Sequence, residues 1–136
     1  MPYEVEEIVA IVLDIDKYPE FLPWCSSAKI LSSTADEQTA QLEITFKGYV
    51  ENYVSRVLLT KDHNQYIVTS EAISGHFKYL KSTWVVQKKN NLSQVEFFID
   101  FQFKSKILNS IVGLMLSTAI NKIITAFEDR VRALSV

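Results

Sequence analysis

Residues 95–134 have the sequence VEFFIDFQFKSKILNSIVGLMLSTAINKIITAFEDRVRAL, in which the spacing of apolar side chains changes once. Up to Phe103 large apolar side chains recur at every second position, which is the period of a β-strand. From Leu108 to Leu134 they recur at every third or fourth position, which is the period of a helix with one apolar face. About thirty helical residues would span roughly 45 Å, longer than a small sheet is wide, so we expect either a bend near Gly113 or a frayed start of the helix.

The residues before this stretch predict more strands. Apolar and polar side chains alternate over residues 40–46, and runs rich in β-branched and aromatic residues cover 49–59, 66–71 and 77–87. The polar turns between these runs are too short for crossover helices, so we expect antiparallel pairing. The sequence therefore predicts an antiparallel sheet of about six strands.

Two short helices are expected at the amino end. Apolar residues recur at helical spacing from Val5 to about Leu13, and a second helical turn is expected over residues 17–20, ending before Pro23. Together with the strands and the long carboxy-terminal helix, they predict an α+β fold. A chain of 136 residues fits one domain, so we expect residues 1–136 to form a single unit.

The amino-acid composition restricts the classes of function that we expect for this chain. The net charge is −2, whereas proteins that bind nucleic acid directly usually show a basic excess. The single cysteine excludes an internal disulfide and fits a reducing compartment. The first residues, MPYEVEE, do not look like a secretory signal, and polar residues interrupt the apolar run 107–124. We expect a soluble protein or a peripheral membrane protein.

Conventional catalytic motifs are missing from the sequence. The two histidines, His63 and His76, lie thirteen residues apart, and no His or Cys spacing is typical of a metal site. Cys25, His76 and Asp100 are the residues one could group for nucleophilic catalysis, but nothing in the sequence brings them together. We predict a protein that is not an enzyme and has no resident metal or cofactor.

Aromatic side chains suggest where an apolar ligand would bind. Residues 18–24 hold three aromatics and two prolines, which form either a rigid corner of the core or the stiff rim of a pocket. Phe98 lies on the strand face opposite Phe97, so that strand is apolar on both sides. The candidate ligand-binding residues are Tyr18, Phe21, Leu22, Trp24, Phe46, Tyr53, Phe77, Leu80, Trp84, Phe98 and Met115.

Polar and basic residues also allow two interpretations each. Tyr53, Arg56, Ser70, Thr83 and Asp100 would fix a ligand headgroup if they point inward, or pair across strands at the surface if they do not. The start of the long helix is either a solvated basic turn or a docking edge for anionic lipid headgroups. The residues of this second candidate site are Lys104, Lys106, Ile107 and Leu108.

Several motifs resemble those of one protein family. They are DKYPEFLPWC at 16–25, FKG at 46–48, YVSR at 53–56, GHFKYL at 75–80 and VEFFIDF at 95–101, followed by AFEDR near the carboxy end. In this order they are similar to the Coq10/RatA proteins of the START-like (polyketide cyclase/dehydrase) superfamily, over nearly the whole chain.

The resemblance implies a helix-grip fold, in which a curved antiparallel sheet grips the carboxy-terminal helix around a tunnel. It also implies binding of ubiquinone or a related polyprenyl lipid, as a carrier for respiration and quinone biosynthesis rather than as an enzyme. Such a protein would work in the bacterial cytoplasm or the mitochondrial matrix, in peripheral contact with the inner membrane. The family carries two other roles, a toxin that blocks ribosomal subunit association and a cyclase or dehydrase.

The chain departs from the family pattern in two places. Family members usually begin with a strand before the first helix, so we expect one edge strand of the sheet to be missing here. His76 stands where the family usually has proline after the glycine, which predicts a less rigid turn.

Overall fold

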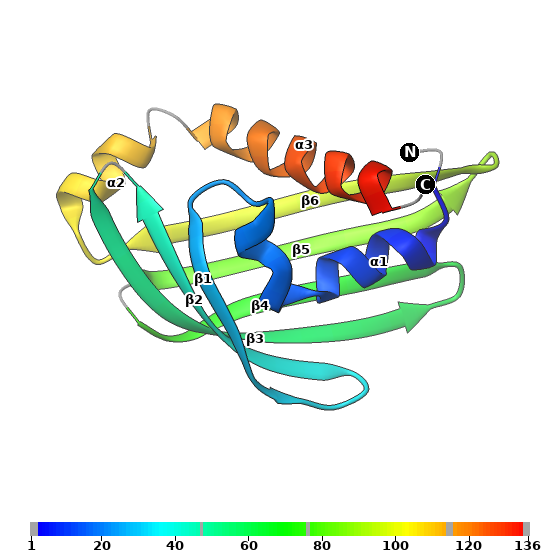
Figure 1. Cartoon of the computed structure of the whole chain (residues 1–136), viewed down its shortest axis with the longest axis horizontal. Helices are drawn as coiled ribbons and strands as arrows, with labels where there is room; N and C mark the ends of the chain where they lie inside the picture. Colours follow the sequence, from blue (N-terminus) through cyan, green and yellow to red (C-terminus); the bar gives the residue numbers. More distant parts are fainter. Residues whose placement is uncertain (1–2, 47, 76, 114–115, 135–136) are drawn as a thin grey trace.

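The computed structural model describes residues 3–46, 48–75, 77–113 and 116–134, which form one curved sheet with helices on one side of it (Figure 1). The helical elements are α1 (Val5–Leu13), the 3₁₀ helix η1 (Ile15–Glu20), α2 (Lys106–Gly113) and α3 (Leu116–Leu134). The strands are β1 (Cys25–Ser33), β2 (Glu37–Phe46), β3 (Tyr49–Asp62), β4 (Gln65–Gly75), β5 (Phe77–Lys89) and β6 (Leu92–Phe103).

The six strands are neighbours in chain order, and every pair is antiparallel. Each connection can therefore be a short turn. Between β5 and β6 the two-residue turn Asn90–Asn91 has positive φ at both positions (54° and 67°), the conformation that suits the right-handed twist of a hairpin. The predicted α+β class and antiparallel sheet are confirmed.

Helix α3 lies along the same side of the sheet as α1, and α2 lies at the opposite end of the molecule from the two termini (Figure 1). Phe127 and Val131 of α3 are buried against the sheet, with 4% and 1% of their surface exposed. The predicted long helix is divided, because α2 ends at Gly113 and α3 begins at Leu116. Glycine is a poor helix former, which agrees with the bend expected there.

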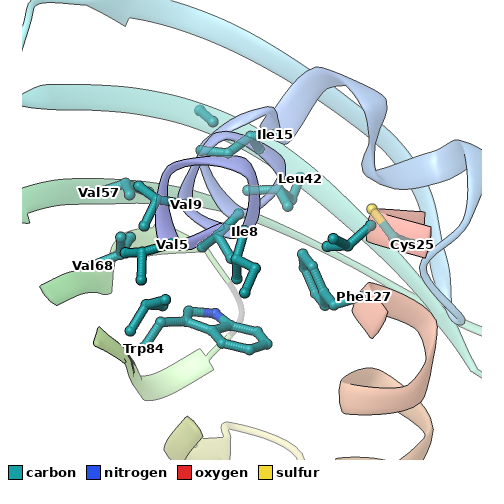
Figure 2. Close-up of a cluster of buried hydrophobic side chains, with 14 residues drawn as sticks. Val5, Ile8, Val9, Ile15, Cys25, Leu42, Val57, Val68, Trp84 and Phe127 are labelled. Carbon is teal, nitrogen blue, oxygen red and sulfur yellow. The ribbon is translucent and has the colours of Figure 1, made fainter. Parts of the chain in front are cut away.

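The core is built from the apolar face of α1. Val5, Ile8, Val9 and Val12 are each no more than 5% exposed and follow helical spacing. Figure 2 shows side chains of this helix facing Val57 and Val68 of the sheet. Complete burial of one such side chain contributes roughly 1.5–3 kcal/mol, so this face is what fixes α1 on the sheet.

Strand β1 is the one strand that the sequence pattern did not locate. Only Cys25 of its nine residues is buried, and two register irregularities interrupt its pairing with β2. An edge strand that is mostly exposed needs no strict alternation of apolar side chains, so its sequence resembles a loop.

Gly75, at the end of β4, is required by the close approach of β3. Its φ is +120°, and a Cβ there would lie 2.6 Å from Tyr53 Cα and closer still to the Asn52 carbonyl oxygen. Gly75→Ala should therefore cost about 3 kcal/mol of unfolding free energy. Gly48→Ala is the matched control, because Gly48 also has positive φ (+85°) but faces open space, and about 1 kcal/mol is expected. Urea unfolding measures both, and equal losses would contradict this role for Gly75.

Candidate ligand-binding site

Two adjoining cavities lie between the sheet and α3. The outer cavity has a volume of about 120 Å³ and the inner cavity about 180 Å³. Five residues line both and so form the boundary between them: Trp24, Ile44, Leu80, Ile99 and Ile123. An apolar cavity of roughly 150 Å³ can hold a benzene ring, so the inner cavity is large enough for one ring-sized group.

The outer cavity is apolar. Its walls come from the ends of the strands near α2, including Phe46, Phe77 and Phe103, and from the first turns of α3. The rings of Phe77 and Phe103 stack with their centroids 4.5 Å apart. Apart from Thr118, every residue around this cavity is hydrophobic, so it offers dispersion contacts and almost no hydrogen bonds.

The inner cavity is apolar on most sides but carries hydroxyl groups on its sheet side. Ser70 of β4 pairs in register with Ser82 of β5, and their hydroxyl groups are hydrogen-bonded to each other. Tyr53 and Ser55 of β3 line the same cavity. No residue around either cavity, among those the structure describes, has a charged side chain.

Trp24 stands at the boundary of the two cavities in an unusual backbone conformation. Its φ is +66°, which is rare for a bulky residue, and its carbonyl oxygen accepts a 2.8 Å hydrogen bond from the Thr45 amide. The indole ring meets Phe46 edge to face at 5.7 Å, and Lys122 Nζ of α3 lies 6.0 Å from the ring centroid. Backbone strain of this kind is often found at functional sites.

Residues 18–23, which precede Trp24 and are called the aromatic corner below, pack against α3. Phe127 meets the ring of Tyr18 at 5.4 Å and that of Phe21 at 5.2 Å, both edge to face. The Tyr18 hydroxyl donates a hydrogen bond to the Val12 carbonyl oxygen. Arg130 lies over the Phe21 ring and forms a 3.2 Å ion pair with the Glu20 carboxylate. The corner therefore packs as core on one side and borders the inner cavity on the other.

Burial controls the protonation of three groups around the inner cavity. It raises the pKa of the Tyr18 and Tyr53 hydroxyls, and neighbouring titratable groups add to both shifts. It also raises the pKa of the Cys25 thiol to about 11, against a smaller opposing effect of the Ser27 backbone. All three groups are neutral at physiological pH, so they add no charge to the cavity.

The structure brings most of the candidate ligand-binding residues to these cavities. The residues that line one or both are Tyr18, Leu22, Trp24, Phe46, Tyr53, Phe77, Leu80 and Trp84. Phe21 does not line them, because its ring packs on Phe127 and borders a separate surface groove. Met115 lies outside the described residues.

The prediction for Phe98 was wrong. Its side chain is 57% exposed, and it lies on the outer face of the sheet. Strand alternation alone gives this result, because Phe97 and Ile99 point inward and line the inner cavity. The apolar bulk on both sides of β6 made the outward residue look like a second lining position.

The polar candidates divide between the two faces of the sheet. Tyr53 and Ser70 line the inner cavity. Arg56 and Thr83 alternate with inward-facing neighbours and so lie on the outer face, where Arg56 is 3.6 Å from the Glu37 carboxylate. Asp100 is exposed and accepts a 3.4 Å hydrogen bond from the Tyr79 hydroxyl. For these three residues the structure supports the surface alternative.

The grouping of Cys25, His76 and Asp100 gains no support. Cys25 is buried beside the inner cavity, whereas Asp100 is exposed on the outer face. His76 lies outside the described residues. Among the residues that are described, no group of three or more His, Cys, Asp or Glu side chains could hold a metal ion.

Several lining residues were not singled out from the sequence. Ile99, Phe101 and Phe103 follow the same period-two alternation as Phe97 and could have been assigned from it. Ser55 and Ser82 carry a weaker signal, since each lies two residues from a predicted inward position. A serine in a strand usually indicates a solvated position, and only the register shows these two to be inside.

The second candidate site lies at the start of α2. Lys104, Lys106 and Ile107 are exposed, and the Ile107 side chain is 66% exposed. The Leu108 side chain lies outside the described part of the chain. No helix in the described ranges is long and apolar enough to cross a membrane.

Residues 1–128 match the model of a protein family described as polyketide cyclase / dehydrase and lipid transport. The chain belongs to this family. The crystal structure of a STAR-related lipid transfer protein from Xanthomonas axonopodis has the same fold, with a TM-score of 0.83. The superposition covers 97% of this chain and 81% of that one, at 12% sequence identity. The helix-grip architecture expected from the resemblance is confirmed.

Two relatives are informative about role. Ribosome association toxin RatA of Rickettsia prowazekii (strain Madrid E) is 41% identical over 133 residues, which cover 97% of this chain and 91% of that protein. Coenzyme Q-binding protein COQ10, mitochondrial, of Saccharomyces cerevisiae is 29% identical over 130 residues, covering 90% and 63%. The resemblance to both groups is confirmed. The sequence motifs favoured the quinone carrier, whereas this comparison favours the ribosome-directed alternative.

The raised pKa of Cys25 predicts how stability depends on pH. A thiol whose pKa rises from 9.0 in the unfolded chain to about 11 in the fold stabilises fully below pH 9, and this contribution is lost between pH 9 and 11. Over that interval the unfolding free energy of the wild type should fall by about 2–3 kcal/mol more than that of Cys25→Ala. Urea titrations at each pH measure the difference, which reports the thiol together with its smaller effect on the pKa of Tyr18 and Tyr53. Parallel pH profiles would contradict the burial of the thiol.

Proposed function

We propose that the chain binds a neutral polyprenyl lipid of the ubiquinone class in the two cavities under α3. The observation that carries this proposal is the uncharged, largely apolar lining of two adjoining cavities. Apolar pockets with a few placed polar groups are the usual form of small-molecule sites. The COQ10 relative supports the ligand class, because its name describes it as a coenzyme Q-binding protein.

The size of the cavities limits how much of such a lipid is enclosed. About 180 Å³ accommodates one ring, and about 120 Å³ accommodates a short piece of chain. A long polyprenyl tail does not fit in this space, and under this proposal it leaves the outer cavity through a mouth between Phe46 and the start of α3, which both line it. Enclosing the head and releasing the tail is the arrangement of a carrier that works beside a membrane.

Helix α2 is well placed to support this at the mouth. Lys104 and Lys106 are exposed there beside the exposed Ile107 side chain. Basic side chains next to an exposed apolar one favour docking onto an anionic lipid surface. Under this proposal the four residues Lys104, Lys106, Ile107 and Leu108 form the docking edge from which lipid enters.

Tryptophan fluorescence should report whether the inner cavity holds a ligand, because both tryptophans of the sequence, Trp24 and Trp84, line it. A bound quinone should quench their fluorescence, and titration with a short-chain ubiquinone gives the dissociation constant. Quenching that saturates near one ligand per chain is expected. Quenching no greater than that of free tryptophan would contradict the proposal.

Replacing Trp24 distinguishes an effect on ligand binding from an effect on stability. Trp24→Gly removes the boundary ring, and glycine suits the positive φ at this position, so strain relief offsets part of the lost packing. We expect at least tenfold weaker binding of the short-chain ubiquinone, measured through Trp84, with about 1 kcal/mol change in stability. Trp84→Ala is the contrasting control, because Trp84 is 5% exposed and its loss should cost about 3–5 kcal/mol. Unchanged affinity in Trp24→Gly would rule out a role for this ring.

A second candidate role is association with the ribosome. The observation that favours it is the 41% identity to a protein named a ribosome association toxin, which exceeds the 29% identity to the COQ10 relative. As a cellular role it is the better supported of the two, and it is compatible with a bound lipid. The net charge of −2 points to contact through ribosomal proteins or local basic surface rather than a general affinity for RNA.

Sucrose-gradient sedimentation tests this role. Excess folded protein added to ribosomes of the source organism should lower the peak of joined ribosomes and raise the peaks of free subunits. The same amount of heat-denatured protein serves as the control. A profile that does not change at excess folded protein would exclude ribosome association, whatever the cavity binds.

A further inference from the structure

The inner cavity gathers its hydroxyl groups on one wall. Tyr53 and Ser55 alternate along β3 and both line the cavity, while Ser70 and Ser82 face it from β4 and β5. The register places Val57 opposite Ser70 and Ile99 opposite Ser82, so the serine pair is flanked by apolar side chains. These four hydroxyl-bearing residues lie together on the sheet, whereas the other polar lining residues described, Thr118 and Tyr18, come from helical elements.

Two of these hydroxyls have unused hydrogen-bonding capacity. Within the described residues, the hydroxyls of Tyr53 and Ser55 have no hydrogen-bond partner. No fully enclosed polar side-chain atom in that part of the chain lacks a partner, so both oxygens must reach open space. Ser55 is only 4% exposed, and the space beside it is the inner cavity. Both hydroxyls can therefore donate a hydrogen bond to a ligand atom in the cavity.

The serine pair offers one further donor. When one hydroxyl donates to the other, the hydrogen of the accepting hydroxyl is left over. Ser70, Ser82, Ser55 and Tyr53 therefore present up to three free O–H donors to one side of a ring-sized space. Carbonyl oxygens, which accept hydrogen bonds and carry no charge, match this set.

The uncharged lining of the inner cavity further restricts the class of ligand. An ionised carboxylate or phosphate placed here would be desolvated without a cation, because no Lys, Arg or His lines the inner cavity among the described residues. The raised pKa values of Tyr18, Tyr53 and Cys25 reflect the same poor solvation of charge. The buried end of the ligand must be neutral.

We infer that the ligand enters head first, with a neutral, carbonyl-bearing ring in the inner cavity hydrogen-bonded to Tyr53, Ser55 and the Ser70–Ser82 pair. Its apolar chain passes Trp24 into the outer cavity and leaves at the mouth beside α2. This inference rests on the proposed lipid binding, and it adds the orientation of the ligand and the residues that recognise its head. It also predicts rejection of lipids whose only polar group is charged.

The test compares two ligands with the same chain in calorimetric titrations of the full chain. Decylubiquinone carries the oxygen-bearing ring, and decylbenzene carries a ring without oxygen. Tyr53→Phe and Ser55→Ala each remove one hydroxyl, and each should weaken decylubiquinone binding about fivefold to tenfold while leaving decylbenzene binding unchanged. Ser82→Ala provides an independent variant if either of these fails to fold.

Matched controls come from hydroxyls outside the cavities. Tyr66→Phe alters a half-buried tyrosine that lines neither cavity, and Ser32→Ala alters an exposed serine of β1. Both should bind the two ligands as the wild type does. Decanoate, which has a similar chain and an anionic head, should bind at least tenfold more weakly than decylubiquinone.

The outcomes separate this inference from the proposed function. If the wild type binds neither decylubiquinone nor decylbenzene, lipid binding itself is wrong and the inference falls with it. If the wild type binds both and the hydroxyl variants bind decylubiquinone normally, lipid binding stands and the head-first orientation is wrong. Equal losses for both ligands, or decanoate binding as tight as that of decylubiquinone, would also overturn the orientation.

Discussion

The packing of α3 on the sheet depends on the contacts of the Phe127 ring with three other aromatic rings. Its ring meets Trp84 of the sheet at 4.8 Å and Tyr18 and Phe21 of the aromatic corner at 5.4 and 5.2 Å, and it is 4% exposed. Edge-to-face pairs of this kind each contribute roughly 0.5–1.5 kcal/mol beyond burial. This single side chain fixes the carboxy-terminal half of α3 to the sheet and to η1 at once. The first half of α3, from Leu116 to Ile123, is left spanning the cavities instead of filling them.

The chemistry of the site follows from what surrounds that space. Strands β2, β5 and β6 present apolar side chains to both cavities, and a cluster of hydroxyl groups lies on the sheet side of the inner one. A neutral amphiphile with a small ring matches both the apolar lining and the hydroxyl groups, whereas a charged head matches neither. The relatives add a second role that the cavities do not explain, because ribosome association concerns the outer surface. A chain can carry both functions, since one uses the interior and the other the exterior.

Much of the fold could be predicted because its signals are periodic. Helix α1 and strands β2 to β6 follow from the spacing of apolar residues, which reflects burial on one face, and the division of the long helix after Gly113 agrees with its excessive length. Strand β1 could not be found in this way, because only Cys25 of it is buried. Within the site, aromatic density identified Trp24 and Trp84 but also selected Phe21 and Phe98, which pack outside the cavities. Ser55 and Ser82 required the register, because a short polar side chain gives the same sequence signal on either face of a strand.

The central claim is that the space under α3 holds a neutral polyprenyl lipid. Native mass spectrometry of the chain, purified without detergent from cells that make ubiquinone, tests it most directly, combined with extraction and identification of the bound lipid. The account predicts one prenylated quinone for each chain, with less of it retained by Trp24→Gly. A chain that carries no lipid, or that carries a fatty acid or phospholipid in its place, would contradict the account.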